Sequence, residues 1–240
     1  MVYNILFSSA YSPVQKILLL VAFVASVIFA ISLHEVAHGY AALKMGDPTA
    51  KVQGRLTLNP LAHFEPIGLL MFVIVGFGFA RPVPVNPYNY RNLRKGTLVV
   101  SFAGVTANLI QSVIAFGLMI GFGYALIASA TASAFVQYLL YFLYHFSLFA
   151  CLLNAVLIAF NLLPIYPLDG FHVVEALTPY GNGYVRFMRR YGQYILIGIV
   201  LIGFLFERVG LPQANIFGRY LSAVQDGILA LFNKIMGAIL

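Results

Sequence analysis

The chain is poor in charge, in cysteine and in tryptophan. Of its 240 residues only 9% are Asp, Glu, Lys or Arg, none is Trp, and one, Cys151, is a cysteine. A lone cysteine cannot form an internal disulfide, which excludes a fold held together by such bonds. The shortage of charge accompanies 61% hydrophobic residues and a mean hydropathy of +0.90, far from the composition of soluble domains. The sequence therefore predicts a polytopic protein embedded in the lipid bilayer.

Acidic residues are the scarcer of the two charges. The chain has 7 Asp and Glu against 14 Lys and Arg, for a formal net charge of +7. In a membrane protein such an excess reports loop topology and contact with anionic lipid. The sequence contains no base-reading or phosphate-cradling motif, so a nucleic-acid partner is not expected.

Long apolar runs predict an all-α fold with about four to six transmembrane helices, because a span needs about 20 apolar residues. We interpret residues 1–240 as a single membrane-embedded domain. The first helix, at about 13–45, is too long for the apolar core of a cleavable signal peptide. The stretch at about 218–240 carries Asp226 and Lys234 on one face, so it either spans the membrane or lies along its surface. The remaining spans are expected at about 97–128, 134–160 and 192–208.

The region 46–96, between the first two spans, is expected to be irregular. Polar and apolar residues alternate over 51–59, which is the pattern of a short β-strand or hairpin. Residues 67–80 are apolar but too few for a full span, so they predict a re-entrant segment. Prolines at 82, 84 and 87 exclude a helix and predict an extended surface loop.

One short motif inside the first apolar run indicates chemistry. In His34-Glu35-Val36-Ala37-His38 the two imidazoles are four residues apart, so they share one helix face and can bind one tetrahedral zinc ion. Glu35 then lies beside the metal, where it can take a proton from water. Charged side chains are costly within lipid and are rarely idle there. The motif predicts a zinc hydrolase that works within the membrane.

Basic residues predict the side of the membrane on which this motif lies. Only Lys16 precedes the first apolar run, which begins at about Ile17, and the positive-inside rule places the basic region that follows this run in the cytoplasm. After two more spans the chain is back on the same side of the membrane, and the loop after the third span is basic again. Both loops therefore predict the same orientation. The residues that set this orientation are Lys44, Lys51, Arg55, Arg81, Arg91, Arg94 and Lys95 in the first loop and Arg186, Arg189 and Arg190 in the second.

A third metal ligand is expected from the cytoplasmic end of the third span. There the chain reads Asn161-Leu162-Leu163-Pro164-Ile165-Tyr166-Pro167-Leu168-Asp169-Gly170, and its prolines break the helix at the membrane depth of the two histidines. Asp169 is the candidate ligand. Two histidines, one carboxylate and an open position for water are typical of a catalytic zinc site, whereas a structural site is closed by four protein ligands.

At these residues the chain resembles the site-2 protease family of intramembrane zinc metalloproteases, in its minimal form without PDZ or CBS domains. The resemblance rests on the two motifs above and on Gly54-Arg55-Leu56-Thr57-Leu58-Asn59-Pro60 and Arg81-Pro82-Val83-Pro84-Val85-Asn86-Pro87 between them. It implies that His34, His38 and Asp169 bind one Zn²⁺ and that Glu35 is the general base. It also implies that Asn161 and Pro167 shape the substrate site.

Two asparagines keep two interpretations each. Asn161 either donates a hydrogen bond to the developing oxyanion or joins two helices, and Asn108, in the second span, has the same alternatives.

The expected activity is hydrolysis of peptide bonds in the transmembrane segments of single-span membrane proteins, in a prokaryotic cell membrane with the active site toward the cytoplasm. Formation of a homo-oligomer stays open. Two alternatives remain. One is a metal or ion transporter that uses the same His/Asp cluster as a transit site. The other is a different membrane zinc hydrolase, such as a prenyl-protein protease.

Overall fold

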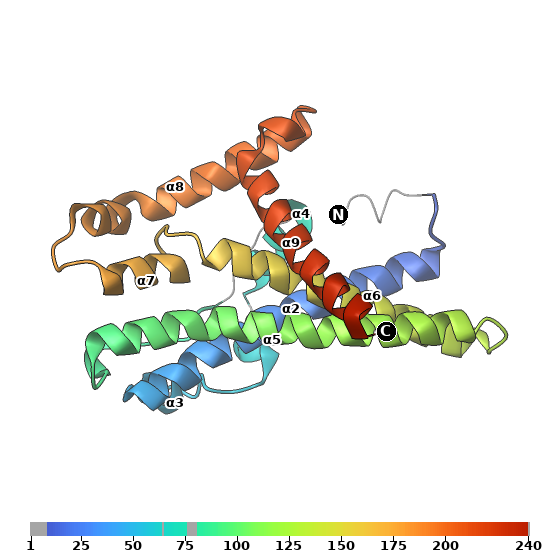
Figure 1. The fold of residues 1–240 in the computed structure, drawn as a ribbon, viewed down its shortest axis with the longest axis horizontal. Helices are drawn as coiled ribbons and strands as arrows, with labels where there is room; N and C mark the ends of the chain where they lie inside the picture. The colour runs from blue at the N-terminus through green and yellow to red at the C-terminus, as the bar shows by residue number, and fades with distance from the viewer. Residues whose placement is uncertain (1–8, 64, 76–80, 240) are drawn as a thin grey trace.

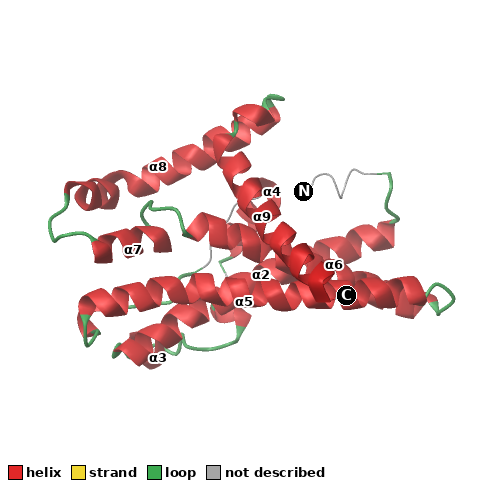
Figure 2. Ribbon diagram, in the orientation of Figure 1, coloured by secondary structure: helices red, strands yellow, loops and turns green. Residues whose placement is uncertain are grey.

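The computed structural model describes residues 9–63, 65–75 and 81–239, and every regular element in these ranges is helical. Figure 2 shows this all-helical chain and the loops that connect it. The longer helices are α2 (Pro13–Met45), α5 (Leu93–Ala128), α6 (Ala134–Asn161), α8 (Gly183–Arg208) and α9 (Ile216–Ile239). The shorter ones are α3 (Thr49–Val52), α4 (Pro66–Val75), α7 (Asp169–Leu177) and single 3-10 turns at Pro60–Ala62, Pro87–Asn89 and Pro212–Ala214.

Helices α2, α5 and α6 pack against one another and form the centre of the molecule (Figure 1). Phe23 of α2 meets Phe149 of α6 edge to face, with ring centroids 5.8 Å apart, in an apolar core cluster. Small polar residues let the helices approach closely and bond across the contacts. The Ser26 hydroxyl donates to the Phe146 carbonyl at 2.9 Å, and the Ser112 hydroxyl donates to the Cys151 carbonyl at 3.1 Å.

Helix α2 carries the His-Glu motif and has well-defined ends. Ser12 caps its N-terminus in a capping box with Gln15, and Pro13 occupies the first turn. At the other end Gly46 adopts φ 112°, a left-handed conformation that glycine takes without strain, and its N–H satisfies the last carbonyls. The helix therefore runs unbroken through both histidines and stops abruptly after Met45.

In the C-terminal third of the chain, helices α7 and α9 lie against this central group. Helix α7 packs on α5, α9 packs on α6, and α8 contacts α9 (Figure 1). Phe232 of α9 joins Phe116 of α5 in a second apolar cluster. The Tyr220 hydroxyl of α9 donates to the Ala159 carbonyl of α6 at 3.0 Å. These contacts leave α7 at one end of the group, close to the C-terminal half of α2.

Four helices of the described chain are long and apolar enough to cross a membrane: α2, α5, α6 and α8. This confirms the prediction of an all-α protein that crosses the membrane several times. Helix α9 is not among the four, although its apolar face packs on α6.

The predicted β-hairpin is wrong, because the described residues contain no strand. Residues 49–52 form helix α3, and the alternating residues after it find no partner strand. Arg55, within this stretch, contacts the proline-rich loop through its side chain, because its Nη2 donates to the Arg81 carbonyl at 2.9 Å. The re-entrant segment is also unsupported: its first part forms helix α4, and residues 76–80 lie outside the described residues.

Candidate functional site

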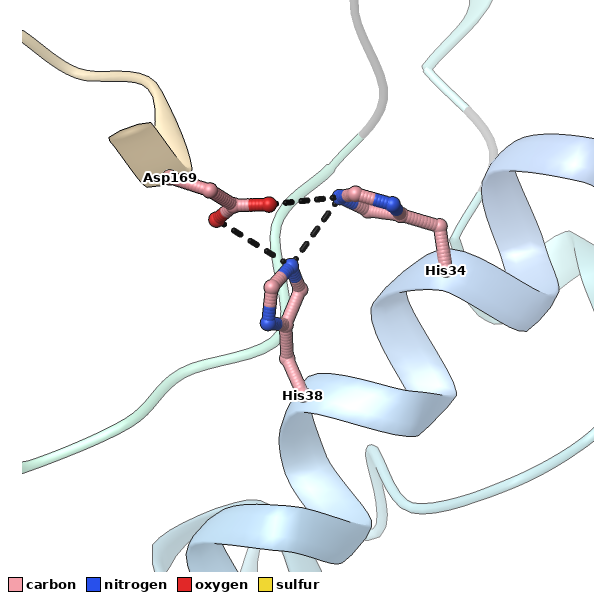
Figure 3. Close-up of side chains that lie close together, drawn as sticks. All are labelled: His34, His38 and Asp169. Atoms are coloured by element: carbon pink, nitrogen blue, oxygen red, sulfur yellow. Dashed lines mark hydrogen bonds and ion pairs between the residues drawn. The ribbon is translucent and has the colours of Figure 1, made fainter. Parts of the chain in front are cut away.

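Three side chains from two distant parts of the chain converge at one point. His34 and His38 lie one turn apart on α2, and Asp169 is the first residue of α7 (Figure 3). The Nε2 atoms of the two histidines are 3.0 Å apart. The Asp169 carboxylate oxygens lie 3.5 Å from His34 Nε2 and 3.3 Å from His38 Nε2. All three offer a ligand atom within 4.8 Å of the others, so the cluster can hold a metal ion.

Helix α5 holds both imidazoles from behind. Nδ1 of His34 lies 2.6 Å from the side-chain oxygen of Asn108, and Nδ1 of His38 lies 2.8 Å from the backbone carbonyl of Val100. A carbonyl oxygen only accepts, so each Nδ1 carries the ring proton and donates it. In a neutral imidazole this leaves Nε2 with a free lone pair. Both lone pairs therefore belong to the atoms that face Asp169.

This arrangement fits a metal cation. With both rings neutral, two nitrogen lone pairs and a carboxylate face one another, an arrangement that a bound metal cation stabilises. Asp169 Oδ2 is buried and has no hydrogen-bond partner among the described residues. Tetrahedral zinc, with bonds of about 2.0–2.1 Å, separates its ligand atoms by about 3.3 Å, close to the separations seen here. Two nitrogens and one carboxylate are also the ligands of a catalytic rather than a structural site.

Gly104 makes the close approach of α5 possible. It lies midway between Val100 and Asn108 on the face of α5 that meets the histidines. A Cβ atom at this position would lie 2.5 Å from His34 Cε1 and would also collide with His38. Only glycine therefore allows the helix backbone to come within hydrogen-bonding reach of both rings.

Local structure brings Asp169 to the histidines. Helix α6 ends at Asn161, the chain turns through Pro164 and Pro167, and α7 begins at Asp169. A carboxylate in the first turn also interacts favourably with the helix dipole. Arg94 of α5 holds the other end of α7, because its guanidinium donates to the last carbonyls of that helix, those of Ala176 and Leu177.

Glu35 is held by the proline-rich loop. The backbone N–H of Val83 donates to Glu35 Oε2 at 2.7 Å. Among the described residues no hydrogen bond reaches the other oxygen, Oε1. Glu35 follows His34 directly on α2, so the carboxylate lies beside the histidine pair with one oxygen fixed and the other available.

The remaining predicted site residues have other surroundings. Asn108 is completely buried and serves as the partner of His34. The Asn161 amide donates to the Leu157 carbonyl of its own helix at 3.1 Å, and not to the cluster. Pro167 lies two residues before Asp169 and follows Tyr166 in a cis peptide bond.

Besides Gly104, sequence reasoning missed three contributors to the site. Two of them are backbone groups, the N–H of Val83 and the carbonyl of Val100. Residue type does not indicate that a backbone group takes part in a site. The sequence alone predicts for Arg94 only a place among the basic residues of a cytoplasmic loop. Arg94 lies at the start of α5, next to the end of α7. A prediction of which helices pack together would have indicated this contact.

Known proteins resemble this chain along most of its length. Residues 22–204 match the model of peptidase family M50. A Bacillus subtilis protein named "Putative zinc metalloprotease YwhC" is 38% identical over 221 residues, covering 90% of this chain and 93% of that protein. A Mycolicibacterium smegmatis protein named "Putative zinc metalloprotease Rip2" is 27% identical over 199 residues, covering 79% and 70%. No solved structure matches significantly.

Proposed function

The chain belongs to peptidase family M50, the site-2 proteases, and from that premise we propose that it hydrolyses peptide bonds within the transmembrane segments of membrane proteins. It is a membrane zinc metalloprotease, whose family acts on membrane proteins in the bilayer. The substrates we propose are single-span proteins. The site faces the cytoplasm of a prokaryotic cell, as the basic loops predict.

The observation that carries this proposal is the convergence of His34, His38 and Asp169 with their lone pairs facing one another. These three residues bind the zinc ion. When bound, zinc supplies Lewis-acid chemistry, which lowers the pKa of a water molecule and polarises a substrate carbonyl. Asn108 and Val100 keep both rings in the tautomer that binds metal through Nε2.

Glu35 is the proposed general base. Val83 holds Oε2, so Oε1 accepts the proton of the attacking water and then returns it to the leaving amine. A peptide bond inside a membrane helix is shielded by its own hydrogen bonds, so the substrate must unwind before its carbonyl reaches this site. We place Asn161 and Pro167 along the substrate path, because both border the turn that presents Asp169.

The test compares the wild-type protein with Glu35→Gln in detergent, on a panel of single-span substrates, together with zinc analysis. We expect cleavage to be lost and one zinc ion to be retained in the variant. Glu207→Gln, at the far end of α8, is the matched control and should cleave normally. Equal cleavage by Glu35→Gln and wild type would reject Glu35 as the base. Zinc transport by vesicles that contain the protein, without any cleavage, would favour a transporter instead.

A further inference from the structure

We propose that Asp47 is a positioning residue for Glu35, acting through the proline-rich loop 81–89. This inference rests on the proposed function, because it matters only if Glu35 is the general base. Asp47 lies twelve residues beyond Glu35 and outside α2, and it touches neither the histidines nor the base.

Asp47 is fully buried, and its carboxylate accepts hydrogen bonds from the loop 81–89 and from the first residue of α3. Its Oδ2 accepts the backbone N–H of Asn86 at 2.6 Å. Its Oδ1 accepts the side-chain amide of Asn89 at 2.8 Å and the backbone N–H of Thr49 at 3.1 Å, and the Thr49 hydroxyl also donates to it. Hydrogen bonds to an ionised acceptor are about twice as strong as neutral ones. The carboxylate therefore fixes the loop 81–89 to the end of α2.

The same loop supplies the donor that holds Glu35. Prolines at 82, 84 and 87 remove three of its N–H groups, and two of those that remain bond to carboxylates from the α2 region. The N–H of Val83 donates to Glu35, and three residues later the N–H of Asn86 donates to Asp47. Pro84 lies between these two residues and its φ is fixed, so the short segment from Val83 to Asn86 has less backbone freedom to absorb a shift at Asn86 before it reaches Val83.

Other contacts leave the loop 81–89 little freedom to adjust if the Asp47 contact is lost. The Val83 side chain is buried against Gly39 of α2, where an added Cβ would lie 2.9 Å from Val83 Cγ1. At the other end of the loop Arg55 Nη2 donates to the carbonyls of Arg81 and Pro82, at 2.9 and 3.2 Å. The Val83 N–H therefore lies between two places where the loop is held. On one side Arg55 bonds the carbonyls of residues 81 and 82, and on the other Asp47 bonds the Asn86 N–H.

The first measurement is the kinetics of Asp47→Ala at neutral pH. We expect kcat to fall by roughly tenfold to a hundredfold, because small displacements of a catalytic group are costly, while KM stays within about twofold and one zinc ion is retained. Asp226→Asn, which neutralises an exposed aspartate on α9, is the charge control and should behave as wild type. Asp47→Asn keeps the size of the side chain and replaces Asp47→Ala if that variant does not fold. An unchanged kcat in the folded variant would overturn the proposal.

A double variant separates positioning from a merely structural role. Val83→Pro removes the N–H that holds Glu35, whereas Val83→Ala keeps that N–H and measures the loss of side-chain packing on Gly39 alone. If Asp47 acts through that N–H, adding Asp47→Ala to Val83→Pro lowers kcat no further, while independent structural effects would multiply. A multiplicative loss, or loss of zinc from Asp47→Ala alone, overturns the proposal.

Failure of this inference and failure of the proposed function give different results. If Glu35→Gln is inactive but Asp47→Ala turns over normally, only the inference falls. If Glu35→Gln cleaves normally, the assignment of the base falls and the inference falls with it.

Discussion

The side-chain oxygen of Asn108 lies 2.6 Å from Nδ1 of His34, in a fully buried contact between α5 and α2. This contact sets which ring nitrogen of His34 carries the proton, and so which one can bind metal. Val100 does the same for His38 with a backbone carbonyl, which no substitution of its own side chain removes. Substitution of Asn108 therefore tests the role of the histidine pair without changing any of the proposed metal ligands.

Asn108→Ala should weaken zinc binding by roughly tenfold to a hundredfold, the usual cost of removing the hydrogen-bond partner of a ligating histidine. Asn108→Asp keeps an acceptor for Nδ1 and should retain most of the affinity. Zinc competition with a chelator measures both. Asn154→Ala is the control, because Asn154 is also a buried membrane asparagine but bonds to its own helix. Equal zinc affinity in Asn108→Ala and Asn154→Ala would contradict the role assigned to Asn108.

Gly104→Ala should abolish stoichiometric zinc binding. The added methyl group would lie 2.5 Å from His34 Cε1 and 2.7 Å from its Nδ1, so either α5 moves away or the rings turn from their metal-binding positions. Gly117→Ala on the same helix is the matched control, since nothing lies within 4 Å of its added Cβ. That control should be neutral or more stable by up to about 1 kcal/mol, because alanine favours helix. Zinc analysis and thermal unfolding of both variants test this, and a fully loaded Gly104→Ala protein would refute it.

The sequence allowed the long helices to be predicted because apolar runs of membrane length have few other solutions. It also predicted which side chains meet: the spacing of His34 and His38 defines a helix face, and topology brings Asp169 to the same depth. The structure places these three together. That they bind zinc stays a proposal, which the experiments above address.

The prediction failed where long-range pairing decides the structure. Alternation at 51–59 is equally compatible with a strand and with irregular chain, and a strand needs a partner that this pattern cannot supply. Arg55 instead bonds to the carbonyls of residues 81 and 82. A local contact sets another boundary: the Asn92 side chain accepts the Lys95 N–H and starts α5 at Leu93, four residues before the apolar run begins. Hydropathy reports neither local caps of this kind nor side-chain hydrogen bonds between distant segments.

Arg94→Met should lower zinc affinity by about tenfold, as expected for a residue that holds a ligand in place without touching the metal. Methionine keeps the apolar stem but removes the donors to the Ala176 and Leu177 carbonyls, so the end of α7 is released and Asp169 is less well fixed. Arg186→Met, which removes an exposed arginine from α8, is the control for loss of charge. Chelator competition on the two variants should separate them, and identical zinc affinities would mean that Arg94 does not act on Asp169.

The Asp47 carboxyl should make the stability of the protein depend on pH in the acid range. Burial alone would raise the pKa of Asp47, but the hydrogen bonds from Asn86, Thr49 and Asn89 outweigh burial and hold the pKa below its ordinary value of 3.8. A carboxyl with a lowered pKa in the folded state stabilises the protein fully above its unfolded pKa, and this contribution is lost as the pH falls through the folded pKa. Thermal unfolding in detergent between about pH 3 and pH 6 should therefore show wild type losing stability toward the acid end more steeply than Asp47→Asn. Asp226→Asn should keep the wild-type slope, and parallel curves for all three proteins would show that Asp47 has no lowered pKa.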